Sequence, residues 1–123
     1  MESIAKLREK VEQVLKGQIT GYLMDELEET VIQSADLNRF LVVRTGWYRG
    51  VNHYALIQDV EVRKNKTVVV YADNTDTDLA EDLTAAGIPV TSIINAHDPD
   101  QVQRLNREKP AQQQEALAQR MAA

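Results

Sequence analysis

The segment that decides the fold runs from Asn38 to Ile94 and reads NRFLVVRTGWYRGVNHYALIQDVEVRKNKTVVVYADNTDTDLAEDLTAAGIPVTSII. Arg39–Thr45 has apolar residues on both faces for most of its length. This is expected of a strand that is covered on both sides and lies in the middle of its sheet. Asn52–Arg63 is the longest strand candidate, and its apolar phase changes after Ile57, which predicts a β-bulge. Thr67–Ala72 is a third β-prone run. We therefore expect three consecutive strands in this segment.

The connections between these strands contain residues that favour turns. Gly46–Val51 is predicted to be a turn, because glycine adopts a positive φ at little cost. Lys64–Lys66 is predicted to be a hairpin turn, in which Asn65 tolerates the left-handed region.

A capped helix is predicted within Asp73–Pro89. Thr75, followed three residues later by Asp78, indicates a capping box, in which the two side chains bond the free backbone N–H groups of the first turn. Gly87 suits the left-handed residue that ends a helix, and Pro89 prevents its continuation. The predicted buried stripe consists of Leu79, Ala80, Leu83 and Ala86.

Shorter elements are predicted on either side. Ser3–Leu15 is amphipathic, with apolar residues three and four apart, and is predicted to be a helix. Residues 18–26 fit either a further helical turn or a loop. Glu29–Ser34 predicts a first strand and Thr91–Asn95 a short last one. The polar residues 100–123 fit either a helix that docks on another surface or a frayed tail.

Together these elements predict a single α+β domain over residues 1–99, followed by the polar tail 100–123. We expect an N-terminal helix, a mainly antiparallel sheet of about four or five strands, and one capped helix packed on the sheet.

Composition restricts the classes of function. The chain has 123 residues, no cysteine and a net charge of -5. The absence of cysteine excludes disulfides, thiol nucleophiles and cysteine-ligated zinc, and the negative charge disfavours binding of a polyanion by the whole surface. No secretory signal or membrane-spanning run is visible, so we expect a soluble cytoplasmic protein without membrane contact.

Acidic residues gather at the start of the second predicted helix, and they are Asp73, Asp76, Asp78, Glu81 and Asp82. They admit either acid–base or metal chemistry, or simple stabilisation of the helix N-terminus, and we favour the second. His53 and His97 would make a metal site only if they converged. No nucleophile elbow or phosphate loop is present, so we predict no cofactor, no metal and no enzymatic activity.

Two groups of residues are candidates for contact surfaces. Trp47, Tyr48 and Arg49 follow one another in the predicted turn, and residues of these types dominate interface hot spots. The alternative, which we favour for Trp47, is that it caps the end of the core while its two neighbours are exposed. A modest basic face is the second candidate, formed by Arg39, Arg44, Arg49 and Arg63.

The order of several motifs resembles the XisI family of element-excision controlling factors, small proteins found mainly in cyanobacteria. The matching residues are Arg44, Gly46-Trp47, Asp73-Asn74-Thr75-Asp76, Leu79-Ala80, Leu83, Gly87-Ile88-Pro89, Ile93, His97 and Pro99. The resemblance covers Phe40–Pro99. It departs from the family at Asp76, where glutamate is usual, at Ala96, where an aromatic residue is usual, and in the polar segment 100–123.

The resemblance implies a role in controlling site-specific excision, with the chemistry performed by a separate recombinase and with an XisH-like protein as companion. It supplies no catalytic residues. We predict a regulatory partner that acts by protein contact, with Arg44, Trp47, Tyr48, Arg49, Asp73 and His97 as the candidate interaction surface. A direct DNA-binding factor using the arginine face is the alternative, and an enzyme at the Asp73 group and His97 is a distant third. Apolar residues on the sheet's outer face would also favour a homodimer.

Overall fold

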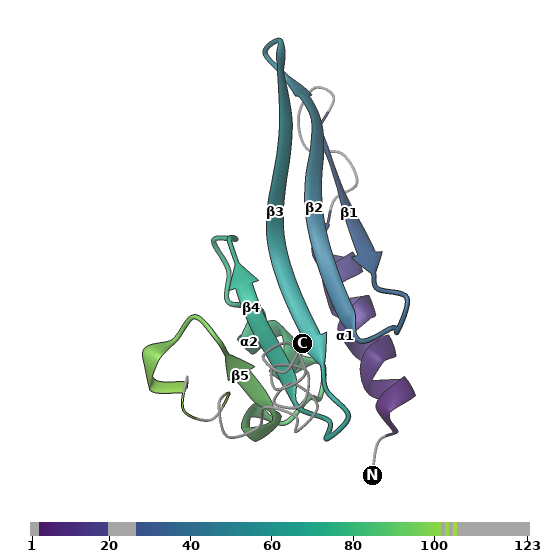
Figure 1. The fold of residues 1–123 in the computed structure, drawn as a ribbon, viewed down its shortest axis with the longest axis vertical. Coiled ribbons are helices and arrows are strands. Elements are labelled where there is room, and N and C mark those ends of the chain that lie inside the picture. The colour runs from purple at the N-terminus through teal and green to yellow at the C-terminus, as the bar shows by residue number, and fades with distance from the viewer. Residues whose placement is uncertain (1–2, 20–26, 102, 104, 106–123) are drawn as a thin grey trace, which may run out of the picture.

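The computed structural model describes residues 3–19, 27–101, 103 and 105 of the chain, and it shows an α+β fold (Figure 1). The elements in chain order are α1 (Ile4–Gln18), β1 (Glu28–Gln33), β2 (Arg39–Tyr48), β3 (Val51–Val62), β4 (Val68–Asp73), α2 (Leu79–Ala85) and β5 (Ile93–Asn95), with short 3-10 helices at Val90–Ser92 and Pro99–Gln101. No helix in the described ranges is long and apolar enough to cross a membrane. The predicted fold class is confirmed.

The five strands form one sheet in the order β1-β2-β3-β4-β5. Pairing is antiparallel from β1 to β4, and β5 lies parallel to β4. Both helices lie against one face of this sheet, which we call the helix face, and the opposite face is called the outer face (Figure 1).

The core lies between α1, α2 and the helix face. Ser3 caps α1 by accepting a hydrogen bond from the Lys6 backbone N–H, 3.2 Å away. The buried side of α1 is formed by Leu7, Val11 and Leu15, which the spacing of apolar residues predicted. The helix continues through Gly17 to Gln18, three residues beyond the predicted end at Leu15. Residues 20–26, whose conformation the sequence left open, lie outside the described ranges, as does nearly all of the segment 100–123.

The bulge predicted after Ile57 is present. Ile57 has no partner in β2, because Val42 pairs with Gln58 and Val43 pairs with Leu56. The pairing of β3 with β4 also shifts, between Asp59 and Val60. These irregularities place Ile57 and Gln58 both in the interior, although neighbours in a regular strand point to opposite faces.

The predicted turn at Gly46–Val51 is wrong in extent. β2 continues through Tyr48, β3 begins at Val51, and only Arg49 and Gly50 form the turn. Both have positive φ, 51° and 76°, as a two-residue type I′ hairpin requires. Gly46 has φ 130° within the strand itself. The turn at Lys64–Lys66 is present, but Lys66, with φ 69°, rather than Asn65, occupies the left-handed region.

The predicted start of α2 also needs correction. Asp78, not Thr75, is the N-cap, and its carboxylate accepts from the Ala80 N–H at 3.0 Å. The Thr75 hydroxyl instead donates to Asp73 at 2.6 Å, and Asp73 accepts from the Leu79 N–H at 2.9 Å. Two aspartates therefore hold the first turn, without the reciprocal bonds of a capping box.

The predicted end of α2 is confirmed. Gly87 has φ 100° and donates its N–H to Thr84, while the Ile88 N–H reaches back to Leu83. This pair of bonds is the Schellman motif. Leu79 and Leu83 of the predicted buried stripe are in the core, whereas Ala86 is exposed because the helix ends before it.

Candidate interaction surface

The hairpin formed by β2 and β3 projects beyond the rest of the sheet (Figure 1). In the described structure, β1 pairs with β2 only as far as Thr45, and β4 pairs with β3 only from Gln58 onward. The part of the hairpin from Gly46 to Leu56 therefore extends past its neighbouring strands. We call this part the hairpin tip.

The outer face of the hairpin tip exposes aromatic and apolar side chains. Trp47 pairs with Asn52 and Thr45 pairs with Tyr54, so Trp47 and Tyr54 are diagonal neighbours on this face. Trp47 is 53% exposed and Tyr54 78% exposed. The prediction that Trp47 caps the core is wrong, because the longer hairpin carries it away from the core.

The opposite face of the tip carries a short stack of polar aromatic groups. The Arg49 guanidinium lies 5.2 Å from the ring centre of Tyr48. The Tyr48 ring meets His53 edge-on, with ring centres 5.9 Å apart. Trp47, Tyr48 and Arg49 are therefore brought together at the tip, as predicted from their sequence, but the two aromatic residues point to opposite faces.

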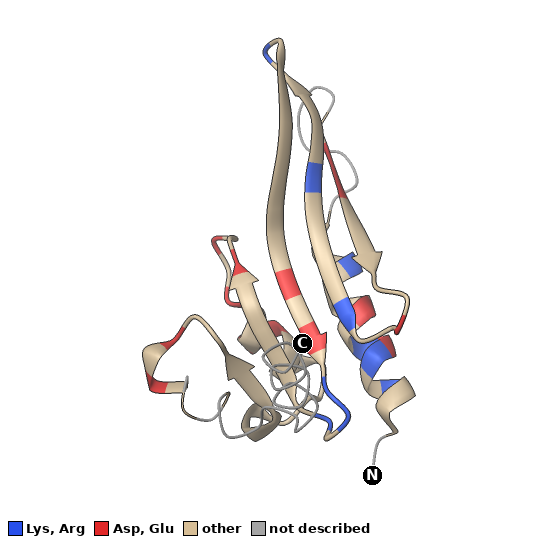
Figure 2. Ribbon diagram, in the orientation of Figure 1, with Lys and Arg blue, Asp and Glu red and all other residues tan. Residues whose placement is uncertain are grey.

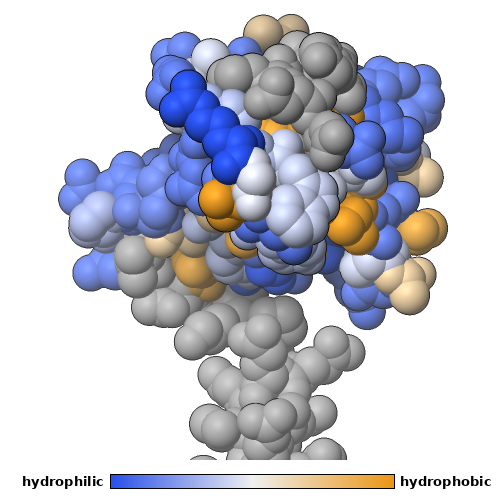
Figure 3. Space-filling view, turned by 90° about the horizontal axis from the view of Figure 1, so that it is seen from above, coloured by the Kyte–Doolittle hydropathy of each residue, from blue (hydrophilic) through white to orange (hydrophobic). Residues whose placement is uncertain are grey.

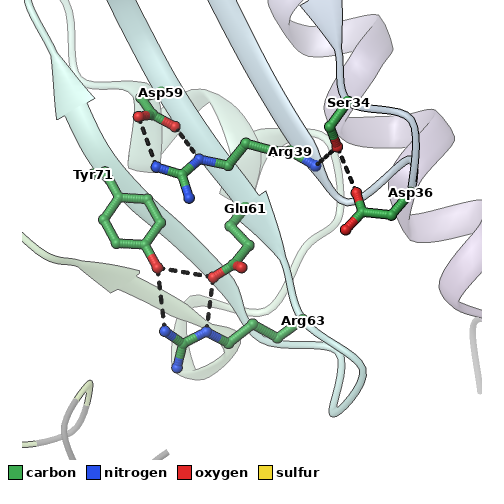
Figure 4. A network of polar contacts seen from close by, with 7 residues as sticks. All are labelled: Ser34, Asp36, Arg39, Asp59, Glu61, Arg63 and Tyr71. Atoms are coloured by element: carbon green, nitrogen blue, oxygen red, sulfur yellow. Dashed lines mark hydrogen bonds and ion pairs between the residues drawn. The ribbon is translucent and has the colours of Figure 1, made fainter. Parts of the chain in front are cut away.

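The lower part of the outer face holds a polar network (Figure 4). Arg39 forms a bidentate pair with Asp59, and its guanidinium lies 4.2 Å from the ring centre of Tyr71. The Tyr71 hydroxyl donates to Glu61 at 2.8 Å, and Arg63 donates to both Glu61 and Tyr71. The hydrogen bond to Asp59 raises the pKa of Arg39, and burial raises the pKa of Tyr71. These charges neutralise one another at the base of the sheet.

The predicted arginine face is not a continuous basic surface. Arg44 points to the helix face and pairs with Glu29 at 3.2 Å, while Arg39 lies on the outer face with Asp59. Arg63 is paired with Glu61, and Arg49 stands at the hairpin turn. Figure 2 shows that blue and red residues lie beside each other across the lower strands.

Asp73 serves the fold, as the capping interpretation of the acidic group predicted. Partial burial raises the pKa of its carboxyl, but hydrogen bonds from Thr75, the Leu79 N–H and Gln58 outweigh this and hold the pKa below its usual value. A further chain of side-chain bonds joins Asp73 to α1, since Gln58 donates to Gln18 at 2.9 Å and Gln18 donates to Asp82 at 2.7 Å.

Gln58 and Gln18 were not singled out from the sequence. Gln58 is only 1% exposed, and the signal that could have found it is the phase change at the bulge, which turns a polar residue inward. Its amide donates to Gln18 at the end of α1 and to Asp73 at the end of β4. Gln18 in turn donates to Asp82 of α2, so the cluster ties these three elements together.

The remaining candidate residues lie apart. His53 is near the hairpin turn, whereas His97 follows β5 at the other end of the molecule and is exposed (Figure 1). The two histidines do not converge. No group of three or more potential metal ligands occurs within the described ranges. Asp73 pairs with Gln58 at the end of β4, below the hairpin tip, and His97 follows β5. These two residues do not share a surface with Trp47, Tyr48 and Arg49.

Comparisons with known proteins place this arrangement in a known group. The family model described as XisI protein matches residues 1–107. A crystal structure of an XisI-like protein from Anabaena variabilis ATCC 29413 is similar, with a TM-score of 0.69 and 20% identity over 78% of this chain and 88% of that one. The fdxN element excision controlling factor XisI from the same organism gives a TM-score of 0.63 and 20% identity over 80% of this chain and 97% of that one. No curated protein sequence matches the chain.

Proposed function

The chain belongs to the XisI family, and on that premise we propose that it is a non-catalytic factor that controls excision of a DNA element through protein contacts. Its target is an XisH-like protein or the recombinase itself. A similar fold carries the description excision controlling factor, which supports a regulatory role in element excision.

The observation that carries the contact mechanism is the hairpin tip. Trp47 and Tyr54 together place two large aromatic side chains on an exposed, projecting face. Aromatic residues lose little conformational entropy on binding and dominate the energetics of protein interfaces. A controlling factor that acts by contact needs such a surface, and the base of the sheet, with its paired charges, offers less to a partner.

Direct DNA binding receives less support. Arg39, Arg44 and Arg63 each have a carboxylate partner, and displacing that partner would offset part of the gain from a phosphate contact. The net charge of -5 acts in the same direction. We therefore favour contact with protein over contact with DNA.

Co-purification with an XisH-like protein tests the proposal. The full chain is expressed together with a tagged XisH-like protein, and the amount retained is compared with that of Trp47→Ala/Tyr54→Ala. We expect about a tenfold or greater loss of affinity, since a hot-spot residue contributes about 2 kcal/mol or more. Val90→Ala is the matched control, because Val90 is apolar, 66% exposed and remote from the hairpin tip. Equal retention of both variants would contradict the proposal, and so would the absence of a wild-type complex with both the XisH-like protein and the recombinase.

A further inference from the structure

The hairpin tip has an open strand edge. Pairing between β3 and β4 ends at Gln58 and Asp73, and beyond it Asn74 donates its N–H to the Ile57 carbonyl and its side-chain amide to the Leu56 carbonyl. No described strand pairs with Val51–Leu56 on this side. No strand of the described ranges occupies the backbone of β3 above Asn74 on this side, so this stretch offers a place for another strand.

The hydrogen bond from the Asn74 side chain to the Leu56 carbonyl shows which backbone N–H and C=O groups of β3 face this edge. The Leu56 carbonyl points to Asn74 and hence away from β2. Backbone direction alternates along an antiparallel strand, so the N–H and C=O groups of Tyr54 and Asn52 also point away from β2. His53 and Ala55 face β2 instead, opposite Gly46 and Arg44. Among the described residues, none hydrogen-bonds to the edge-facing groups of Asn52 and Tyr54.

Above the bulge at Ile57, this edge lacks the other features that normally block strand addition. Edge strands are protected by charged residues, proline, bulges or short length. β1, at one border of the sheet, contains Glu28 and Glu29, and β5, at the other, has three residues. Residues 51–58 contain no charged residue and no proline. The upper half of β3 is accordingly free of red and blue in Figure 2.

The surface around the tip does not favour a purely apolar contact. Seen from above, hydrophobic residues form separate spots between hydrophilic ones rather than a single patch (Figure 3). The feature that repeats along the edge is therefore its open backbone hydrogen-bonding groups. Another β-strand can pair with such groups.

We propose that this edge of β3 pairs with the same edge of a second copy of the chain, antiparallel, around a two-fold axis at His53. A two-fold axis makes the pairing antiparallel and self-complementary. In this register Asn52 of each copy lies opposite Tyr54 of the other, so the two residues with open backbone groups satisfy each other. The outer-face aromatic residues of both copies remain available, so the dimer goes beyond the proposed contact function and does not depend on it.

Charge complementarity supports a second copy as the occupant. With the axis at His53, the turn of one copy reaches the level of Leu56 and Ile57 of the other, where Asn74 ends the open edge. This brings the Arg49 side chain of each copy to the loop that precedes α2 in its partner. That loop carries the exposed Asp76 and Asp78. The Arg49 guanidinium at the tip thus lies near the carboxylates of Asp76 and Asp78 in the partner. Because Val51–Leu56 of β3 carries no charge, two negatively charged chains can approach each other along this strand.

Sedimentation velocity of the full chain tests the pairing. Wild type is expected at twice the chain mass of 13.9 kDa, and Tyr54→Pro is expected at the single mass. Proline removes the edge-facing N–H of residue 54 and leaves the bonds between β2 and β3 in place. Ile32→Lys is the matched control, because Ile32 is 44% exposed on β1 at the far side of the sheet, and it should remain dimeric.

A charge exchange tests the register without relying on proline. Arg49→Asp and Asp76→Arg should each weaken the dimer about tenfold, and the double variant should recover most of the loss, because the two side chains meet across the interface. Aspartate tolerates the left-handed conformation at position 49. A monomeric wild type, dissociation by Ile32→Lys but not by Tyr54→Pro, or failure of the double variant to recover would overturn the proposal. A monomer that binds an XisH-like protein at this edge would also overturn it.

Discussion

The two halves of the β2–β3 hairpin differ sharply in what surrounds them. The lower half is flanked by β1 and β4, covered by both helices on one face and crossed by the network of Arg39 and Tyr71 on the other. The upper half has neither flanking strand among the described residues and exposes Trp47 and Tyr54. The same two strands therefore supply stability at one end and a contact surface at the other.

This difference arises from the position of the bulge. Ile57 and Gln58 both turn inward where the core begins, and Asn74 ends the pairing with β4 at the same level. Above that level the strand alternates regularly, but no layer formed by the described residues covers it. Packing should then be costly to change below the bulge and nearly free to change above it.

A pair of aromatic truncations should give the largest contrast between the two halves. Phe40 is fully buried in the lower half, and Phe40→Ala should lower the free energy of unfolding by about 3–5 kcal/mol through lost burial and a residual cavity. Trp47→Ala, in the upper half, should change it by about 0.5 kcal/mol or less. Urea denaturation of both variants measures the difference, and equal losses would show that the tip is packed as part of the core.

The sequence predicts the lower half better than the upper half, because its signals are local. The phase change after Ile57 predicts the bulge, and Gly87 followed by Pro89 predicts the end of α2. Gly46 misled the prediction of the turn, since a glycine with a positive φ can also lie within a strand. The long tip therefore was not foreseen, and the exposed position of Trp47 was the less favoured of the two alternatives.

The polar contacts were harder to predict, because several residues compete for the same bonds. Thr75, Asp73 and Asp78 all lie within reach of the first N–H groups of α2, and only the path of the chain from β4 decides between them. The partners of Arg39 and Arg44 depend on strand register, which the geometry of the turns helps to set and which the alternation of apolar residues does not define alone.

Two glycines with positive φ lie in different surroundings, one in the core region and one at the hairpin tip. Gly87 ends α2 at φ 100° and Gly50 lies in the hairpin turn at φ 76°. Alanine at either site costs about 1–2 kcal/mol in backbone strain. At Gly87 an added methyl group would lie 3.1 Å from the Lys10 ammonium, whereas nothing lies within 4 Å at Gly50. The Lys10 side chain is long enough to move, so strain should dominate at both sites.

Gly87→Ala and Gly50→Ala should reduce stability in different ways, one globally and one locally. Gly87→Ala should lower the free energy of global unfolding by about 1–2 kcal/mol, because α2 belongs to the core. Gly50→Ala should instead accelerate hydrogen exchange near the turn with little change in global stability, since a projecting hairpin can open alone. Urea denaturation combined with amide exchange separates these outcomes. A loss of global stability at Gly50 as large as at Gly87 would contradict independent opening of the tip.

The smallest effect concerns Asp73, which lies at the boundary between the two halves. Its folded pKa is held below the unfolded value of about 3.9, so the ionised carboxylate stabilises the fold above that pH. The contribution is lost as pH falls through the lower, folded pKa. Asp73→Asn should therefore destabilise the protein by about 1 kcal/mol at pH 7, as expected for a capping carboxylate, and the deficit should shrink at more acid pH.

Glu9→Gln is the control, because Glu9 is an exposed carboxylate on α1 and takes no part in the proposed dimer contact. It should leave the free energy of unfolding unchanged between neutral and acid pH. If Asp73→Asn lowered the free energy of unfolding by the same amount down to the lowest pH at which the protein stays folded, the effect would come from altered packing and not from the lost charge. The end of β4 would then be defined by packing around Gln58, and the boundary of the tip would not depend on the charge of Asp73.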